Sequence, residues 1–188
     1  LLATRPPQAV DAAQSLTLTK QQVLVSVAAG LPLADLAPHR GGAALARAMP
    51  VTAAEAGASP TMVYAEDPAV RARVAGLFGL CGRAVPAAHE ADFDVGTALA
   101  CVYGWFFELY AQLAYEAQAA GLSPETARQM TLGMAEGAAR VTLETSRDPH
   151  AIAEQIASPG SFTRLGLKHL DERDAFAPWV ESFRLLME

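Results

Sequence analysis

The chain has 188 residues, of which 52% are hydrophobic and 18% are charged, and its 14 Lys and Arg against 20 Asp and Glu give a formal net charge of -6. This composition excludes a disordered chain and indicates a packed globular protein. The acidic balance argues against nucleic acid as a partner, because binding to phosphates requires clustered Lys and Arg. Apolar runs stay below the roughly 18 to 20 residues of a membrane span, so we expect no membrane partner.

The first part of the chain, up to about residue 88, predicts short strands that alternate with helices. Apolar and β-branched runs between turn residues are typical of buried strands, and apolar residues at helical spacing indicate helices. The expected strands lie at residues 1–4, 23–29, 43–49, 61–65 and 84–86, and the expected helices at residues 8–16, 33–36 and 69–79. This alternation implies an α/β fold with a parallel sheet.

From about residue 90 the pattern is helical. Residues 93–120 contain no Pro and are apolar on almost every face, which indicates a helix at the centre of a bundle or at a subunit interface. Further helices are expected at residues 123–145, 148–157, 163–172 and 176–187. Gly133 and Gly137 share one helix face, which favours a tight helix pair or a dimer seam. We therefore predict two domains, residues 1–89 and residues 90–188.

The cysteines and histidines predict neither a metal site nor a disulfide. Cys81 and Cys101 form no Cys-x-x-Cys pair, and the four histidines are dispersed. A reducing cytoplasm is the simpler location for such a chain. The first residue is Leu1 rather than Met, so we expect the chain to begin inside a longer protein.

A Gly-x-Gly-x-x-Gly phosphate loop is absent, and the glycines between residues 76 and 82 are typical helix caps. Residues 157–163 form a small polar loop that leads into a helix. The N–H groups of a helix start can bind a carboxylate or phosphate, and Ser161 and Thr163 would add hydroxyl donors. A plain capping loop between two helices explains the same residues.

An aromatic group follows the start of the long helix. Tyr103, Phe106, Phe107 and Tyr110 are spaced as one helix face, with Trp105 beside them. Such a stripe favours core or interface, and a substrate pocket is the minority interpretation. No group of residues typical of acid–base or nucleophilic catalysis is evident in the sequence.

Four segments in order resemble the pyrroline-5-carboxylate reductase family, which reduces a cyclic imine to proline with NAD(P)H. Residues 2–6 resemble the family's Ala-Val-Lys-Pro strand end, and residues 25–30 its Ile-Ser-Ile-Ala-Ala-Gly strand. Residues 47–50 resemble its Arg-x-Met-Pro, and residues 156–171 its Ser-Pro-Gly-Gly-x-Thr signature.

The resemblance implies an incomplete Rossmann-like parallel sheet, whose phosphate-binding loop is not in this chain, followed by an all-α helical dimerisation domain. Its implied partners are an imine substrate, NADP or NAD, and a second copy of the chain. The residues expected to contact the cofactor are Arg5, Pro6, Ala29, Gly30, Met49 and Pro50. Substrate is expected at Gly160, Ser161 and Thr163, with the Thr163 hydroxyl on the imine nitrogen.

The chain also departs from the family pattern. Val51 stands where the family has Asn beside the cofactor, and Ser161 replaces the second Gly of the signature. The family's Ser-Gly-Ser-Gly-Pro-Ala-Tyr loop aligns with residues 100–106, Ala-Cys-Val-Tyr-Gly-Trp-Phe, so Tyr103 and Trp105 are expected to alter specificity. Three alternatives stay open: a reductase of a more apolar imine, a non-catalytic dimerisation or regulatory protein, and an enzyme of another Rossmann branch.

Overall fold

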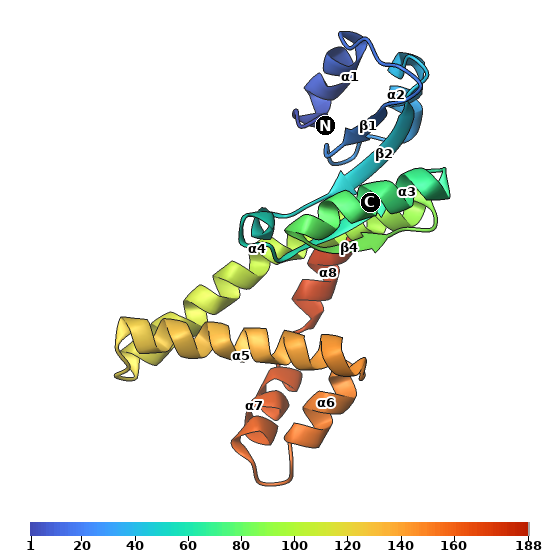
Figure 1. Cartoon of the computed structure of the whole chain (residues 1–188). Helices are drawn as coiled ribbons and strands as arrows, with labels where there is room; N and C mark the ends of the chain where they lie inside the picture. The colour runs from blue at the N-terminus through green and yellow to red at the C-terminus, as the bar shows by residue number, and fades with distance from the viewer. Residues whose placement is uncertain (188) are drawn as a thin grey trace. The chain divides into compact units, whose positions relative to one another are not determined.

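The computed structural model describes residues 1–187, which divide into two compact units, Leu1–Tyr103 and Gly104 onward (Figure 1). The first unit contains the strands β1 (Val23–Ser26), β2 (Ala44–Met49), β3 (Ser59–Tyr64) and β4 (Gly82–Pro86). Its helices and 3-10 turns are α1 (Pro6–Gln14), α2 (Leu33–Leu36), η1 (Ala37–His39), η2 (Thr52–Ala56), α3 (Pro68–Phe78) and η3 (Gly79–Cys81). The remaining helices are α4 (Glu90–Ala119), α5 (Pro124–Thr145), α6 (Pro149–Ile156), α7 (Phe162–Asp171) and α8 (Ala177–Leu185).

The sheet has the order β1-β2-β3-β4 and is mixed. β1 and β2 are parallel, β2 and β3 are antiparallel, and β3 and β4 are parallel. The predicted all-parallel sheet is therefore wrong at the β2–β3 pair. Residues 50–58 hold only the turn η2 between these strands, whereas a parallel connection needs a crossover of about a dozen residues or more.

The predicted strand at residues 1–4 is reduced to a single bridge. Leu2 pairs with Ser26 in the parallel direction. Its N–H donates to the Val25 carbonyl at 2.8 Å, and the Val27 N–H donates to the Leu2 carbonyl at 3.1 Å. The first residues thus continue the parallel part of the sheet beyond β1.

Two apolar clusters cover the two faces of this sheet. One packs α1 and α2 against β1 through Ala9, Ala13, Leu24 and Leu36. The other packs α3 against β1, β2 and β3 and includes Val25, Ala46, Val63, Val74 and Phe78. Neighbouring residues Leu24 and Val25 fall into opposite clusters, as expected for successive residues of a strand.

The predicted helices of the second half are confirmed, with caps of the expected type. Ser123 Oγ accepts the Thr126 N–H at 3.1 Å at the start of α5, and Asp148 Oδ2 accepts the Ala151 N–H at 3.2 Å at the start of α6. Each N-cap is followed by a Pro at the first helical position, which is pre-organised for a helix start.

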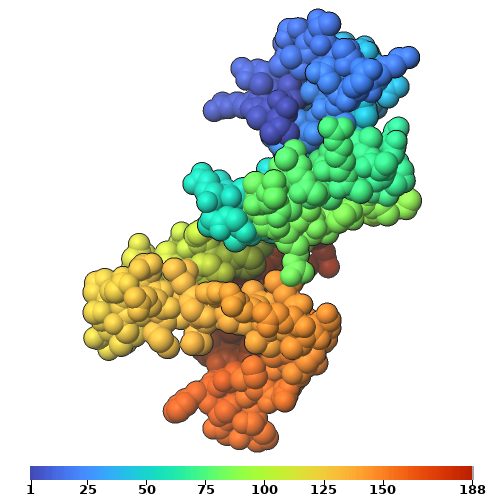
Figure 2. Space-filling view, viewed as in Figure 1, coloured from blue at the N-terminus to red at the C-terminus, as the bar shows by residue number. Residues whose placement is uncertain are grey.

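Apolar surface is poorly covered in the second unit. Between residues 104 and 187 only Ala127 and Ala157 are buried. Figure 2 shows the side chains of α5, in yellow and orange, open to solvent along the visible face. Large exposed apolar side chains there include Met134 (64% exposed), Leu143 (57%) and Leu165 (65%). A helical unit of this kind needs another surface to bury its apolar face.

Candidate functional site

One edge of the sheet gathers the loops that the sequence assigns to the cofactor. Leu2, β1 and β2 run in the same direction, so the segments after them leave from the same edge. These segments carry Arg5 and Pro6, Ala29 and Gly30, and Met49 and Pro50, respectively. All six residues predicted to line the cofactor therefore lie at or just after the same end of these parallel strands.

The same edge offers groups that a ligand could engage. Arg5, Pro6, Ala29 and Gly30 are exposed. Gly30 has a φ of +66°, and a Cβ there would meet nothing within 4 Å, so its backbone faces open space. The Thr4 hydroxyl is buried and has no hydrogen-bond partner among residues 1–187. A buried hydroxyl without a partner is costly, so it is suited to a ligand or a water.

Two buried hydroxyls on β3 hold the turn after β2. Ser59 Oγ accepts the Val51 N–H at 3.0 Å and lies 3.0 Å from Thr61 Oγ1. Both side chains are fully buried. They fix the backbone next to Met49 and Pro50. The sequence pattern did not reveal this role, because Ser59 and Thr61 belong to no motif.

A buried arginine joins β2 to the first turn of α4. Arg47 is 1% exposed, and its Nη1 lies 2.9 Å from Glu90 Oε1 and 2.8 Å from Asp94 Oδ1. Its guanidinium lies over the Phe93 ring, 4.3 Å from the centroid. Glu90 Oε1 also accepts the Leu33 N–H at 2.8 Å. The sequence indicates Arg47 only as part of the Arg-x-Met-Pro segment, whereas the structure gives it three partners on α4.

The loop between α6 and α7 holds Gly160, Ser161 and Thr163. Ser161 caps α7, and its Oγ accepts the Arg164 N–H at 3.1 Å. Gly160 has a φ of +80°, which an L side chain rarely adopts. Thr163 is exposed in the first turn. The N–H groups of such a turn point out of the helix and favour an anion.

Arg164 ties the two ends of this loop together. Its Nε donates to the Ala157 carbonyl at 2.8 Å, and Nη1 and Nη2 donate to Glu154 at 3.2 and 2.9 Å. The hydrogen bonds between Arg164 and Glu154 hold the pKa of the Glu154 carboxyl below its usual range and raise the pKa of Arg164. Arg164 on α7 therefore fixes the start of the loop, through its hydrogen bonds to Ala157 and to Glu154 of α6.

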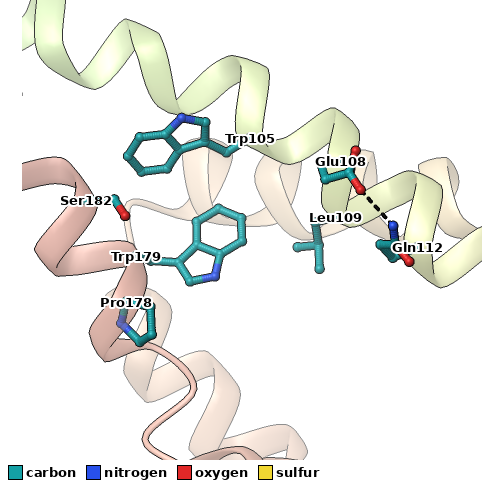
Figure 3. Close-up of a pocket in the computed structure, with 7 residues that line it drawn as sticks. All are labelled: Trp105, Glu108, Leu109, Gln112, Pro178, Trp179 and Ser182. Atoms are coloured by element: carbon teal, nitrogen blue, oxygen red, sulfur yellow. Dashed lines mark hydrogen bonds between the residues drawn. The ribbon is translucent and has the colours of Figure 1, made fainter.

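A cavity of about 550 Å³ lies between α4 and α8 in the second unit (Figure 3). Its lining residues are Trp105, Glu108, Leu109, Gln112, Pro178, Trp179 and Ser182. The two indole rings meet edge to face, with centroids 6.0 Å apart and planes at 68°. Of the predicted substrate residues, Trp105 lines this cavity, whereas Tyr103, Gly160, Ser161 and Thr163 do not.

The parts of the chain that the structure describes hold no cluster of three or more His, Cys, Asp or Glu that could bind a metal ion. Across residues 1–187, every helix is too short or too polar to cross a lipid bilayer. Both cysteines are free, with Cys101 exposed on α4.

The chain thus combines a mixed α/β sheet, which has exposed loops at one edge, with a helical unit whose apolar faces are uncovered. A model of the pyrroline-5-carboxylate reductase dimerisation domain matches residues 90–183. The chain belongs to the pyrroline-5-carboxylate reductase family.

Relatives match through both units. Pyrroline-5-carboxylate reductase of Pseudomonas aeruginosa is 34% identical over 183 residues, which cover 93% of this chain and 67% of the relative. The enzyme of Glycine max is 32% identical over 181 residues, covering 91% and 64%. The chain thus spans about two thirds of the length of these relatives.

Solved structures agree on the fold. The 1-pyrroline-5-carboxylate reductase of Streptococcus pyogenes has a TM-score of 0.85 and 25% identity, covering 98% of this chain and 72% of its own. The Plasmodium falciparum pyrroline carboxylate reductase with NADP bound has a TM-score of 0.87 and 20% identity, covering 98% and 75%. The mixed sheet and the helical region are therefore the family fold.

Proposed function

We propose that this chain carries an NAD(P)H-dependent reductase activity on a cyclic imine, and that it acts as a homodimer through its helical unit. The observation that carries the proposal is the match through both units to pyrroline-5-carboxylate reductases, at 34% identity over 183 residues in the first of them. That match covers 93% of this chain, and the α6–α7 loop also lies within the matched dimerisation-domain residues 90–183.

The cofactor is proposed to lie along the edge formed by Arg5, Pro6, Ala29, Gly30, Met49 and Pro50. The open backbone at Gly30 and the unpartnered buried hydroxyl of Thr4 support this placement. When bound, NADP(H) or NAD(H) would supply the hydride. The chain's residues would shape and orient the nicotinamide side, and Ser59 would keep the turn at Pro50 in place.

The substrate is proposed to sit at the α6–α7 loop. The free N–H groups of the first turn of α7 would hold the substrate carboxylate, as a helix start does for anions. The Thr163 hydroxyl would hydrogen-bond the imine nitrogen, and Gly160 and Ser161 would shape the approach. This division leaves little covalent chemistry to the protein, which supplies orientation and charge neutralisation.

Bulky side chains at residues 100–106 support a substrate more apolar than the family's own. Tyr103 and Trp105 stand where the family has small residues, in a continuous part of α4. A non-catalytic dimerisation or regulatory role is the second candidate, and it is favoured by these same bulky residues.

The direct test is the imine-dependent oxidation of NADPH and of NADH, with 1-pyrroline-5-carboxylate and with a cyclic imine that lacks the carboxylate. It is run on the 188-residue chain and on the longest polypeptide encoded by its gene. Oxidation of either cofactor supports the proposal. If no imine causes oxidation of NADPH or NADH, and calorimetry detects no cofactor binding, the non-catalytic alternative is favoured.

The role of Thr163 has its own test. Thr163→Val should lower kcat by about tenfold to a hundredfold, because the hydroxyl bond to the imine nitrogen is lost, while cofactor affinity stays unchanged. Thr142→Val is the matched control, since the Thr142 hydroxyl donates only to the Ala138 carbonyl of its own helix. Equal effects of the two substitutions would remove Thr163 from the proposed site.

A further inference from the structure

The cavity between α4 and α8 has the composition of a ligand site, and it shares only Trp105 with the residues proposed for the substrate. Its volume of about 550 Å³ lies within the roughly 300 to 1,000 Å³ of small-molecule sites. Apolar walls come from the two indoles, Leu109 and Pro178, and polar groups from Glu108, Gln112 and Ser182 (Figure 3).

The aromatic walls are held in place by further rings. Phe106 stacks on Trp179 with centroids 6.1 Å apart and planes at 29°, and it stacks on Tyr110 with centroids 6.1 Å apart and planes at 11°. Trp179 is therefore packed against both Trp105 and Phe106. This packing fixes the indole orientation before a ligand arrives, which lowers the ordering cost of binding.

The charge of the cavity has one sign. Among its seven lining residues, Glu108 is the single one with a formal charge. Glu108 Oε1 accepts the Gln112 amide at 2.6 Å. No hydrogen bond from residues 1–187 reaches its other oxygen, Oε2. The carboxylate is thus oriented by a neutral neighbour.

We infer that this cavity binds an organic monocation with a small apolar body, such as a quaternary or ring ammonium. Indole faces attract a cation through the ring quadrupole, and the exposed Glu108 carboxylate lines the same cavity with the opposite charge. A neutral ligand of the same shape gains neither the attraction to the indole rings nor the attraction to the carboxylate. A ligand with its own carboxylate is repelled by Glu108.

The site is tested by binding in the absence of any nicotinamide cofactor, so the result is independent of the proposed reductase activity. The chain has two tryptophans, and both line the cavity. Tryptophan fluorescence, excited selectively over the four tyrosines, therefore reports on this site.

The probes are choline, its neutral carbon analogue 3,3-dimethylbutan-1-ol, and glycine betaine, which adds a carboxylate to the same trimethylammonium group. Choline should change the fluorescence saturably and bind roughly tenfold more tightly than the neutral analogue. Glycine betaine should bind more weakly than choline. No saturable change up to 100 mM choline (on the order of the weakest measurable cation–π site), equal binding of the neutral analogue, or tighter binding of betaine would each overturn the inference.

A matched pair of variants assigns the effect to the carboxylate. Glu108→Gln should bring choline and the neutral analogue to within about twofold of each other, while the fluorescence without ligand stays unchanged. Glu116→Gln, an exposed position two turns along α4 that does not line the cavity, should keep the preference. Trp179→Phe retains a ring in case larger truncations unfold the unit, and it should weaken choline more than the neutral analogue. A preference that survives Glu108→Gln would contradict the inference.

Discussion

Arg47 is a fully buried side chain whose acidic partners are only partly buried. Glu90 and Asp94 keep 29% and 54% of their side-chain surface exposed. Water therefore still reaches the carboxylates, and the guanidinium is the group that depends on this pairing. Its Nε is buried without a hydrogen-bond partner among residues 1–187, so the ion pairs and the Phe93 ring must offset its desolvation.

Arg47→Met should lower the free energy of unfolding by about 2–4 kcal/mol, near the lower end for a broken buried ion pair because the two carboxylates regain water. Urea unfolding at neutral pH measures this. The control is Arg140→Met, because Arg140 and Glu136 form an exposed pair on α5 whose loss should cost no more than about 0.5 kcal/mol. Similar losses in both variants would contradict the structural role of Arg47.

Gly82 starts β4 at a φ of +140°, and a Cβ there would collide with the backbone N and O of Ser59. Gly82→Ala should therefore destabilise the chain by more than about 2 kcal/mol, through both strain and the lost pairing of β3 with β4. Gly76→Ala is the matched substitution, because Gly76 lies in α3 with open space around it. It should stabilise the chain by about 0.5–1 kcal/mol. Thermal unfolding of both variants gives the comparison.

The ion pair between Arg164 and Glu154 at the α6–α7 loop makes the stability of the folded chain depend on pH in the acidic range. Arg164 holds the pKa of Glu154 below its usual range, chiefly through hydrogen bonds. A carboxyl with a lowered pKa in the folded chain adds stability above its ordinary pKa. That stability is lost as the pH falls through the lowered value.

Arg164→Met should raise the pKa of Glu154 back toward the ordinary value, because its hydrogen-bond donors are removed. Carboxyl carbon chemical shifts followed by NMR between neutral and acidic pH measure the change. Glu125, whose pKa is lowered by Arg128 on α5, is the internal control and should not move. An unchanged titration of Glu154 would mean that this ion pair does not exist in solution.

Secondary structure was more predictable from this sequence than strand direction. Apolar runs and capping residues place β1, β2, α3 and the later helices close to their observed bounds. Alternation of strands and helices predicts a parallel β2–β3 pair, whereas the structure has an antiparallel one. The short link at residues 50–58 contains the contrary signal, since it has no room for a crossover helix.

The candidate site was predictable where it coincides with ordered motifs, such as the residues after β1 and β2. Contacts between distant segments were not. Nothing in the sequence pairs Trp105 with Trp179, or Ser59 with Val51, because such contacts depend on how helices and strands pack. The orphan hydroxyl of Thr4 likewise follows from burial, which a single residue in a short apolar run does not reveal.

For the whole molecule, the sparse burial of the second unit supports a dimer. Gly133 and Gly137 lie on α5, and a Cβ at either would meet nothing within 4 Å. No part of the described chain therefore uses this face for close packing. Small residues let a helix of another copy approach, which is the proposed use of this surface.

Gly137→Leu is expected to change the stability of α5 and the affinity of the dimer in opposite directions. It should raise the helix stability of α5 by about 0.5–1 kcal/mol, yet weaken the dimer by at least about tenfold, because the bulky side chain would hold the partner helix away. Sedimentation velocity over a concentration series measures the dimer constant. Gly76→Leu, on α3 of the first unit, should leave it unchanged. A dimer unaffected by Gly137→Leu would place the interface elsewhere.

The arrangement of the sheet also bears on how the chain folds. β2, β3, α3 and β4 follow one another between residues 44 and 86, and their pairing closes only the turn at residues 50–58 and the crossover through α3. Short loops cost little chain entropy, so this segment is expected to form early and to open last. Its backbone amides, those of Ala48 and Val63 among them, should then be the slowest to exchange with deuterium, while those of α6 and α7 exchange first.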